Sequence, residues 1–410
     1  MKLFKYVIIG NGVAGLHAAE TIRREASTDS VIEIYTEEEY LTYSRPKLPQ
    51  YIAEEFNQEE LFLKTKTWFD EQNILISLGK KVTKIDDNNK KIYFSDGEST
   101  NYDRLLIATG SHSFLLPIKG TDHPRVKTLR SLDDAKILMT VIKDSKQVVV
   151  IGGGLLGLEI ANAIRTKGVN VTIIEYFPRL LPLQLDLEGA EVLKKIIEDR
   201  GMRIILGATT ESIEEKEKNL LTIKIKDGRA TIADLIVISA GVRPNIDIAK
   251  QSDIEFNRGI IVNEYMETNK VDIWAAGDVT EMDNQCWGII PAAFAQANVA
   301  AKNMINLDEK IPCGKIIPSN TLKVAGIDLT SIGTVYFEKL PDNVEEKRFI
   351  DIEKGIYKKV VIQDNQVIGA IWLGVKTNLF DIQKIVKKRI NVEKFKDKLL
   401  KPDFNLKDFT

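Results

Sequence analysis

The stretch MKLFKYVIIGNGVAG, residues 1–15, decides the fold class of this chain. Its residues up to Ile9 are mostly apolar or aromatic, as is typical of a buried parallel strand. Leu16 to Arg24 then predicts a helix. Between the two lie the three glycines of a GxGxxG pattern: Gly10, Gly12 and Gly15. The first permits a tight turn, the second lets the backbone approach a pyrophosphate, and the third lets the helix pack on the strand. A plain glycine-rich turn is the alternative, but the flanking strand and helix favour a dinucleotide site.

Composition sets the broad class. The 410 residues predict two or three domains, and 44% hydrophobic with 28% charged residues is ordinary for a soluble globular protein. A formal charge of −2 gives no bias toward nucleic acid or membrane. We find neither a signal-peptide pattern nor an apolar run near the roughly 20 residues of a membrane span, so a cytoplasmic location is expected. The sparse cysteines and histidines predict neither a disulfide scaffold nor a metal site: Cys286, Cys313, His17, His112 and His123.

Val31 to Thr36 predicts the second strand. A carboxylate near the end of this strand usually binds the ribose hydroxyls of the nucleotide, about 20 residues after the glycines. Thr36 occupies that position here, so we expect Glu37 or Glu38 to take the role. The alternative is that this acidic run is a solvated turn. The loop SRPKLP (residues 44–49) follows and brings the cations Arg45 and Lys47 close to the predicted site.

A second nucleotide unit begins after the strand YDRLLIATG, residues 102–110. QVVVIGGGLLGLE (residues 147–159) repeats the order of strand, GxGxxG and helix, with the glycines Gly152, Gly154 and Gly157. The helix is predicted from Leu155 to Thr166. The next strand ends on Glu175, whose carboxylate would bind a ribose and repel a 2′-phosphate. This predicts NADH over NADPH, although the nearby Arg179 could accommodate such a phosphate.

Three later segments complete the pattern. VDIWAAGD (residues 271–278) predicts a buried strand that ends on Gly277 and presents Asp278 as an acceptor. From Gly288 a helix is expected, with Pro291 in its first turn. The region 381–400 predicts a basic amphipathic helix. From 376 to 401 there are nine Lys or Arg against three Asp or Glu, which indicates either a solvated face or a surface for an acidic partner.

The order GNGVAG, YDRLLIATG, GGGLLGLE, ISAGVRPN, WAAGD resembles the flavoproteins that use pyridine nucleotides, the pyridine nucleotide-disulfide oxidoreductases. The resemblance implies an α/β fold with two Rossmann-like domains, glutathione-reductase-like, plus a small α+β C-terminal domain. It implies discontinuous FAD-binding residues 1–115 and 248–312, NAD(H)-binding residues 116–247, a C-terminal domain over 313–380 and a basic helical tail over 381–410. The implied FAD residues are Gly10, Gly12, Val13, Ala14, Gly15, Glu37, Glu38, Arg45, Pro46, Thr109, Gly110, Gly277, Asp278, Pro291 and Ala292. The implied NADH residues are Gly152, Gly154, Leu156, Gly157, Glu175 and Gly241.

Two further residues take catalytic roles by the same resemblance. Glu159 matches a position near flavin and nicotinamide, and Lys47 is a candidate for contacting the flavin. The segment SNTLKVAGIDLTSIG (residues 319–333) is similar to rubredoxin reductases and to the flavin half of NADH-dependent nitrite reductases. Disulfide reductases carry a redox cysteine where this chain has SRPKLP, and here no cysteine precedes Cys286. Thiol–disulfide chemistry therefore loses support.

These features predict an oxidoreductase that takes hydride from NADH onto FAD and passes electrons to an external carrier. A small acidic protein such as rubredoxin is the first candidate, because of the tail. No metal, nucleic acid or membrane partner is expected, and a monomer or homodimer is predicted. One alternative is an NADH oxidase that reduces oxygen. Another is an NADH-sensing redox flavoprotein that acts as a scaffold without fast turnover.

Overall fold

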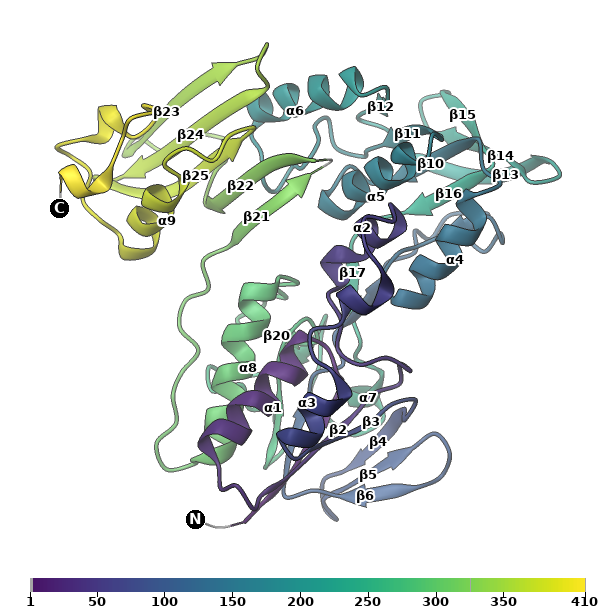
Figure 1. Ribbon diagram of the computed structural model, residues 1–410, viewed down its shortest axis with the longest axis vertical. Coiled ribbons are helices and arrows are strands. Elements are labelled where there is room, and N and C mark those ends of the chain that lie inside the picture. Colours follow the sequence, from purple (N-terminus) through teal and green to yellow (C-terminus); the bar gives the residue numbers. More distant parts are fainter. Residues whose placement is uncertain (1–2, 325, 410) are drawn as a thin grey trace. The chain divides into compact units, whose positions relative to one another are not determined.

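The computed structural model describes residues 3–324 and 326–409 and divides into two compact units (Figure 1). The first unit holds the residues up to Lys47, Phe56–Phe114 and Val242–Ile316. The second holds Leu48–Glu55, Leu115–Gly241 and the chain from Ile317 onward. Each unit contains one parallel five-stranded sheet and one glycine loop.

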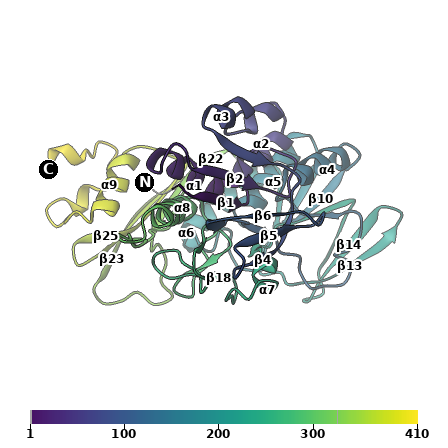
Figure 2. The same cartoon turned by 90° about the horizontal axis from the view of Figure 1, so that it is seen from below.

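The sheet of the first unit has the order β19-β7-β1-β2-β3, and all its pairings are parallel. Its strands are β1 (Lys5–Ile9), β2 (Val31–Tyr35), β3 (Ile74–Ser77), β7 (Arg104–Ile107) and β19 (Ile273–Ala275). Helices α1 (Val13–Glu25) and α8 (Ile290–Ile305) lie side by side in both ribbon views (Figures 1 and 2). Their small residues, such as Ala18 and Ala300, are fully buried in the core. The predicted first strand and helix are confirmed.

Shorter elements of the first unit surround this sheet. An antiparallel sheet is formed by β4 (Val82–Asp86), β5 (Lys91–Phe94) and β6 (Ser99–Asn101). Two-stranded pairings join β8 (Ser111–Ser113) to β17 (Val242–Pro244) and β18 (Ile260–Ile261) to β20 (Thr280–Glu281). The helical elements are η1 (Arg45–Lys47), η2 (Gln58–Leu61), α3 (Lys66–Glu71) and α7 (Asp247–Lys250).

The second unit repeats the design with the sheet order β12-β11-β10-β16-β9. These strands are β9 (Val126–Lys127), β10 (Gln147–Ile151), β11 (Asn170–Ile174), β12 (Arg203–Ile205) and β16 (Leu235–Ile238), all paired in parallel. Its helices are α2 (Leu48–Ile52), α4 (Leu132–Ile142), α5 (Leu155–Thr166) and α6 (Leu187–Asp199). A small antiparallel sheet comprises β13 (Thr210–Glu217), β14 (Leu220–Ile225) and β15 (Ala230–Ala233). The predicted helix Leu155–Thr166 is confirmed to the residue.

The C-terminal part of the second unit forms an antiparallel sheet with a core of its own. Its order is β21-β22-β25-β24-β23: β21 (Ser319–Val324), β22 (Ile327–Gly333), β25 (Gln366–Leu373), β24 (Ile356–Gln363) and β23 (Val344–Asp351). Buried polar groups connect this sheet to α6. The Asp186 carboxylate, which caps α6, accepts hydrogen bonds from the Tyr357 hydroxyl (2.5 Å) and the Lys359 ammonium (2.9 Å).

The prediction of one helix over 381–400 is wrong. Helix α9 runs only from Leu379 to Lys388, because Arg389 is left-handed (φ +49°) and ends it. The chain beyond continues as loops and two short turns, η3 (Lys396–Lys398) and η4 (Leu406–Asp408). Three aromatic rings hold this segment together with centroids 4.8–5.9 Å apart: Phe395, Phe404 and Phe409. Hydrophobic spacing suggested a longer helix, but these rings stack on one another in loops and turns.

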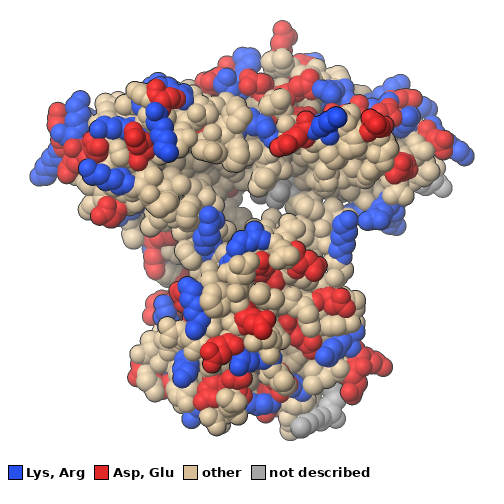
Figure 3. Space-filling model, turned by 180° about the vertical axis from the view of Figure 1, so that it is seen from behind, with Lys and Arg blue, Asp and Glu red and all other residues tan. Residues whose placement is uncertain are grey.

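Charges of both signs are interspersed on the face drawn in Figure 3, as the formal charge of −2 suggests. Over residues 3–324 and 326–409, no helix is both long and apolar enough to cross a bilayer. The same residues contain no group of three or more His, Cys, Asp or Glu side chains that could hold a metal ion.

Candidate functional site

The first glycine loop joins β1 to α1 and leaves room for a phosphate. Gly10 is left-handed (φ +110°), and a Cβ there would lie 2.2 Å from the carbonyl oxygen of Ala108. A Cβ at Gly15 would lie 2.0 Å from the carbonyl oxygen of Gly10, so helix and strand pack without any intervening side chain. A Cβ at Gly12, in contrast, would have no neighbouring atom within 4 Å. The loop is therefore closed on the protein side and open on the side where a ligand would bind.

Helix α1 offers hydrogen-bond donors at this opening. Gly12 is its N-cap and carries no capping side chain. The first-turn N–H groups, those of Val13, Ala14 and Gly15, have no intrahelical acceptor, because the first N–H groups of any helix lack one. Together with the helix dipole they form an anion site of the kind that binds pyrophosphate.

The turn after β19 brings a distant segment to the same loop. Gly277 is left-handed (φ +86°), and a Cβ there would lie 2.9 Å from the Cβ of Ala14. The next residue, Asp278, accepts a hydrogen bond of 2.8 Å from the Ser111 hydroxyl. Thr109 and Gly110 lead into Ser111, and Asn245 fixes them by donating to the Thr109 carbonyl oxygen (2.7 Å). The structure thus brings together Asp278 and the Thr109–Gly110 turn, all three of them residues that the resemblance assigns to FAD.

The acidic run after β2 has a different arrangement from the one expected. Glu38 forms an ion pair with Arg45 (2.5 Å) and accepts a hydrogen bond from the Tyr43 hydroxyl (2.6 Å). Glu37 is more than half exposed and pairs with Lys81 at 3.0 Å. Pro46 follows Arg45 in η1 and is exposed. The structure therefore joins two predicted FAD residues, Glu38 and Arg45, to each other, and the choice between Glu37 and Glu38 as ribose ligand stays a prediction.

Sequence reasoning missed one residue of this site, Gln296. It lies on α8, 1% exposed, and its Oε1 accepts a hydrogen bond of 2.9 Å from the Gly277 N–H. Its Nε2 has no hydrogen-bond partner among the described residues. Pro291 and Ala292 occupy the first turn of the same helix, Ala292 buried and Pro291 exposed. An Ala-rich helix with a single glutamine was the only available signal in the sequence.

The residues present fit FAD. The open space at Gly12, the first-turn N–H groups of α1 and the Asp278 carboxylate supply room, donors and an acceptor for a pyrophosphate and a polyol chain.

The second glycine loop, between β10 and α5, has nearly the same backbone. Gly152 is left-handed (φ +121°), with a Cβ position 2.2 Å from the Ser239 carbonyl oxygen, and the Cβ position of Gly157 lies 2.0 Å from the Gly152 oxygen. Gly154 is open, and Leu156 lies in the first turn of α5. Gly241 is also left-handed (φ +93°) with open space around it. These residues fit a second dinucleotide.

Glu175 has a role that its position in the sequence does not reveal. The side chain is buried, and its two oxygens accept backbone hydrogen bonds from Gly153 (2.5 Å) and Phe177 (2.8 Å). The carboxylate therefore supports the glycine loop from inside. Since each carboxylate oxygen has a second lone pair, these bonds still permit the predicted contact with a ribose hydroxyl.

The two predicted catalytic residues lie in different units. Glu159 is on α5 in the second unit, and no hydrogen bond or ion pair joins its carboxyl to any residue that the structure describes. Burial raises the pKa of Glu159 to about 8, so the group is largely protonated at neutral pH. Lys47 belongs to the first unit, where it is exposed and its ammonium lies 5.5 Å from the centre of the Phe56 ring. Both roles stay predictions.

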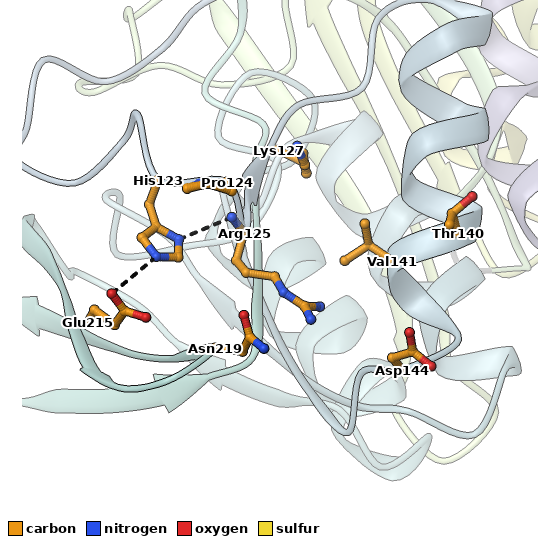
Figure 4. A pocket seen from close by; sticks show the side chains of 9 residues that line it. All are labelled: His123, Pro124, Arg125, Lys127, Thr140, Val141, Asp144, Glu215 and Asn219. Carbon is orange, nitrogen blue, oxygen red and sulfur yellow. Dashed lines mark hydrogen bonds and ion pairs between the residues drawn. The ribbon is translucent and has the colours of Figure 1, made fainter.

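A cavity of about 470 Å³ opens elsewhere in the second unit (Figure 4). His123 lies 3.8 Å from Glu215 of β13, Arg125 follows it just before β9, and Asp144 lies just before β10. These segments sit at the amino ends of parallel strands, whereas the glycine loop follows the carboxyl end of β10. The cavity is therefore not the dinucleotide site.

Residues 4–303 match the family Pyridine nucleotide-disulphide oxidoreductase. The chain belongs to this family. Residues 318–390 match the C-terminal domain of rubredoxin NAD+ reductase. The predicted resemblance and fold class are thereby confirmed, and membership implies binding of FAD and of a nicotinamide dinucleotide.

Several relatives define what the chain is similar to. It is 34% identical over 400 residues to a nitrite reductase (NAD(P)H) of Bacillus subtilis, covering 97% of this chain and 49% of that one. It is 32% identical over 383 residues to an NADH-rubredoxin oxidoreductase of Clostridium acetobutylicum, covering 92% and 94%. The crystal structure of NADH:rubredoxin oxidoreductase from that organism superposes with a TM-score of 0.77 at 28% identity, over 96% of this chain and 98% of the other. The chain spans about half the length of the nitrite and nitrate reductase relatives that it matches.

Proposed function

We propose that this chain is an NADH-dependent FAD reductase that passes electrons to a small protein carrier, with rubredoxin as the first candidate. The observation that carries the proposal is the pair of glycine loops, each open at its second glycine, Gly12 and Gly154. Bound FAD would supply the exchange between a two-electron donor and one-electron acceptors. The chain's own part is to bind and orient both nucleotides and to hold a proton on Glu159 near neutral pH.

A preference for NADH is supported by two side chains of the second unit. The Glu175 carboxylate lies against the glycine loop, where a negative charge disfavours a 2′-phosphate. Arg179, which could have compensated, is engaged elsewhere. Its guanidinium donates to the carbonyl oxygens of Leu185 (3.3 Å) and Pro182 (3.1 Å) and stacks 4.4 Å from the centre of the Tyr336 ring.

A carrier is favoured over a protein thiol as the electron acceptor. The loop at 44–49 holds no cysteine, and burial raises the pKa of both Cys286 and Cys313, which makes them poor thiolates. The match of residues 318–390 to a rubredoxin reductase domain supports rubredoxin. The second half of α9 and its C-cap provide a basic surface that would suit an acidic partner: Lys384, Lys387, Lys388 and Arg389, all exposed. Phe380, in the first turn of the same helix, is 87% exposed.

Turnover with a panel of acceptors tests the proposal. The purified protein should absorb in the flavin region, oxidise NADH faster than NADPH, and reduce rubredoxin without consuming oxygen. Reversing the charges of Lys387, Lys388 and Arg389 should raise the KM for rubredoxin about threefold to tenfold and weaken its salt dependence. A colourless protein would contradict the assignment of FAD. An unchanged KM for rubredoxin would show that the basic surface of α9 is a solvated face and does not bind the carrier.

An NADH oxidase is the second candidate. The observation that favours it is 32% identity over 346 residues to an NADH oxidase of Methanocaldococcus jannaschii, which covers 81% of this chain and 76% of that one. Peroxide or water formation from NADH without any added carrier would support this function. Slow reoxidation together with an NADH-dependent change of assembly would instead support a redox-sensing scaffold.

A further inference from the structure

The turn that presents Asp278 is held from beneath by a helix side chain. Gly277 donates its N–H to Oε1 of Gln296 (2.9 Å), and its carbonyl oxygen accepts the N–H of Thr280 (3.0 Å). The Thr280 hydroxyl lies within hydrogen-bond distance of two acceptors, the Gly277 carbonyl oxygen (2.8 Å) and Gln296 Oε1 (3.1 Å). Both side chains are about 1% exposed. Backbone and side chains thus form one closed, buried set of hydrogen bonds around the turn.

The direction of the Gln296 amide is fixed by its neighbours. A backbone N–H and a hydroxyl both face one end of the amide, and the N–H can only donate. The end that faces them must therefore be the oxygen, because an amide NH₂ there would place two donors against each other. The turn brings Gly277 close to the phosphate-binding helix: a Cβ on Gly277 would lie 2.9 Å from the Ala14 methyl group. The Gln296 amide therefore holds the turn at a point where it packs against α1.

We propose that Gln296 is a positioning residue for the flavin nucleotide. It acts through Gly277: by holding that N–H, it fixes the turn and thereby the place of the Asp278 carboxylate next to the first glycine loop. The inference rests on the proposed function, since it concerns the site that FAD would occupy. The inference goes beyond the proposed function because it assigns part of the affinity for FAD to a side chain that lies beneath the turn and is shielded from solvent.

Asn303 provides a matched control on the same helix. It is another fully buried amide and makes three hydrogen bonds, to the Tyr265 oxygen (3.0 Å), the Ile311 oxygen (2.9 Å) and the Ile311 N–H (2.8 Å). None of these partners belongs to the turn. Gln296→Met and Asn303→Leu each replace an amide by an apolar side chain of similar shape, so both should lower the melting temperature.

The experiment measures release of FAD from the diluted holoenzyme by the recovery of free flavin fluorescence. Gln296→Met should release FAD about tenfold faster than the unmodified protein, and Asn303→Leu less than about threefold faster. Gln296→Glu keeps an acceptor oxygen for the Gly277 N–H and should restore most of the retention. If Gln296→Met does not fold, Thr280→Val takes its place, with an expected increase of about threefold.

Equal release rates for Gln296→Met and Asn303→Leu would overturn the inference, because the effect would then follow loss of stability alone. Unchanged release from Gln296→Met, or from Thr280→Val where that variant is used, would overturn it too. In these cases the unmodified protein still carries FAD, so the proposed function stands. A protein that carries no FAD at all would remove the proposed function and the inference together.

Discussion

The two glycine loops of this chain share one backbone but are supported differently. In both, the first glycine donates to the strand opposite, Gly10 to Tyr35 (2.7 Å) and Gly152 to Ile174 (2.8 Å). In both, the Cβ position of the third glycine lies 2.0 Å from the carbonyl oxygen of the first, and the second glycine is open. The backbone that a dinucleotide pyrophosphate requires has therefore been built twice.

The difference lies at the residue between the first two glycines. In the first loop this is Asn11, whose side chain accepts a hydrogen bond from the Thr42 hydroxyl and donates to the Tyr40 carbonyl oxygen (3.4 Å). In the second loop it is Gly153, whose N–H donates to Glu175 and whose Cβ position lies 2.7 Å from a methyl group of Leu180. One loop is held by hydrogen bonds of its own side chain to the 40–42 segment, and the other by a strand-end carboxylate.

The residues that follow β2 and β11 differ as well. At the end of β11 the carboxylate of Glu175 is needed by the loop itself. At the end of β2 the matching residue is Thr36, the loop is held by the Asn11 side chain, and Glu38 pairs with Arg45. Sequence spacing predicts a displaced acid at Glu37 or Glu38, and the structure shows Glu38 paired with Arg45.

The largest expected effect concerns the residue two places after each third glycine. Burial raises the pKa of Glu159 in the second unit to about 8, and burial lowers the pKa of His17 in the first, against a smaller opposing effect of Glu20. Both side chains are thus driven to their neutral forms. Because the native state holds the Glu159 proton more tightly than the unfolded state, stability should fall as pH rises from about 4.5 to about 8. His17 affects stability in the opposite direction: because its native-state pKa is lowered, the stability it contributes is lost as pH falls through about 6.5.

Melting temperature against pH checks this. Glu159→Gln should remove a loss of about 2–4 kcal/mol between pH 5 and 8, and it should stabilise the protein most at pH 8 and above. His17→Gln should instead stabilise only at acidic pH. Parallel curves for Glu159→Gln and the unmodified protein would show that Glu159 titrates normally.

The second glycines separate the two sites. Gly12→Ala and Gly154→Ala each add a methyl group with no protein atom within 4 Å, so the fold should be unaffected. Overpacking against a nucleotide should cost up to about 3 kcal/mol, or roughly a hundredfold in affinity. Gly12→Ala should therefore lose FAD, and Gly154→Ala should keep FAD but raise the KM for NADH. Absorption of the purified variants and NADH titration distinguish them, and loss of FAD from Gly154→Ala would contradict the assignment of the loops.

Much of this arrangement could be predicted from the sequence, and the limits have physical reasons. The two strand–glycine–helix units, the turn at Asp278 and the α5 boundaries all follow from local periodicity and from glycines that tolerate no Cβ. The hydrogen bond from Gly153 to Glu175 and the role of Gln296 could not be predicted in this way, because each depends on a partner that only the tertiary fold brings near. The end of α9 at Arg389 was missed because the aromatic stacking that holds the following loops joins Phe395 to Phe404 and Phe409.

Glu175→Gln tests how far the second glycine loop depends on the Glu175 carboxylate, and its expected effect on NADH binding is smaller. Glutamine has one acceptor oxygen, so it can serve only one of the Gly153 and Phe177 N–H groups and places an NH₂ against the other. The KM for NADH should rise about tenfold. The KM for NADPH should rise less, because the charge that repels a 2′-phosphate is gone. Thr36→Ala at the matching position of the first unit should leave FAD retention unchanged. An unaltered KM for NADH in Glu175→Gln would show that the loop does not depend on this carboxylate.

The smallest effect is expected for Asn11→Ala, which removes the side chain that holds the first loop. Asn11→Ala removes the hydrogen bonds to Thr42 and Tyr40 but leaves the glycines in place, so FAD release should quicken by about threefold while the KM for NADH stays the same.

The residues that hold the two loops should not be interchangeable. In Gly153→Asn the new side chain would begin 2.7 Å from Leu180 and 3.0 Å from the Glu175 carboxylate, so the loop must shift and NADH binding should be lost. A Gly153→Asn protein with normal NADH kinetics would show that the two loops differ by sequence drift rather than by how each is held.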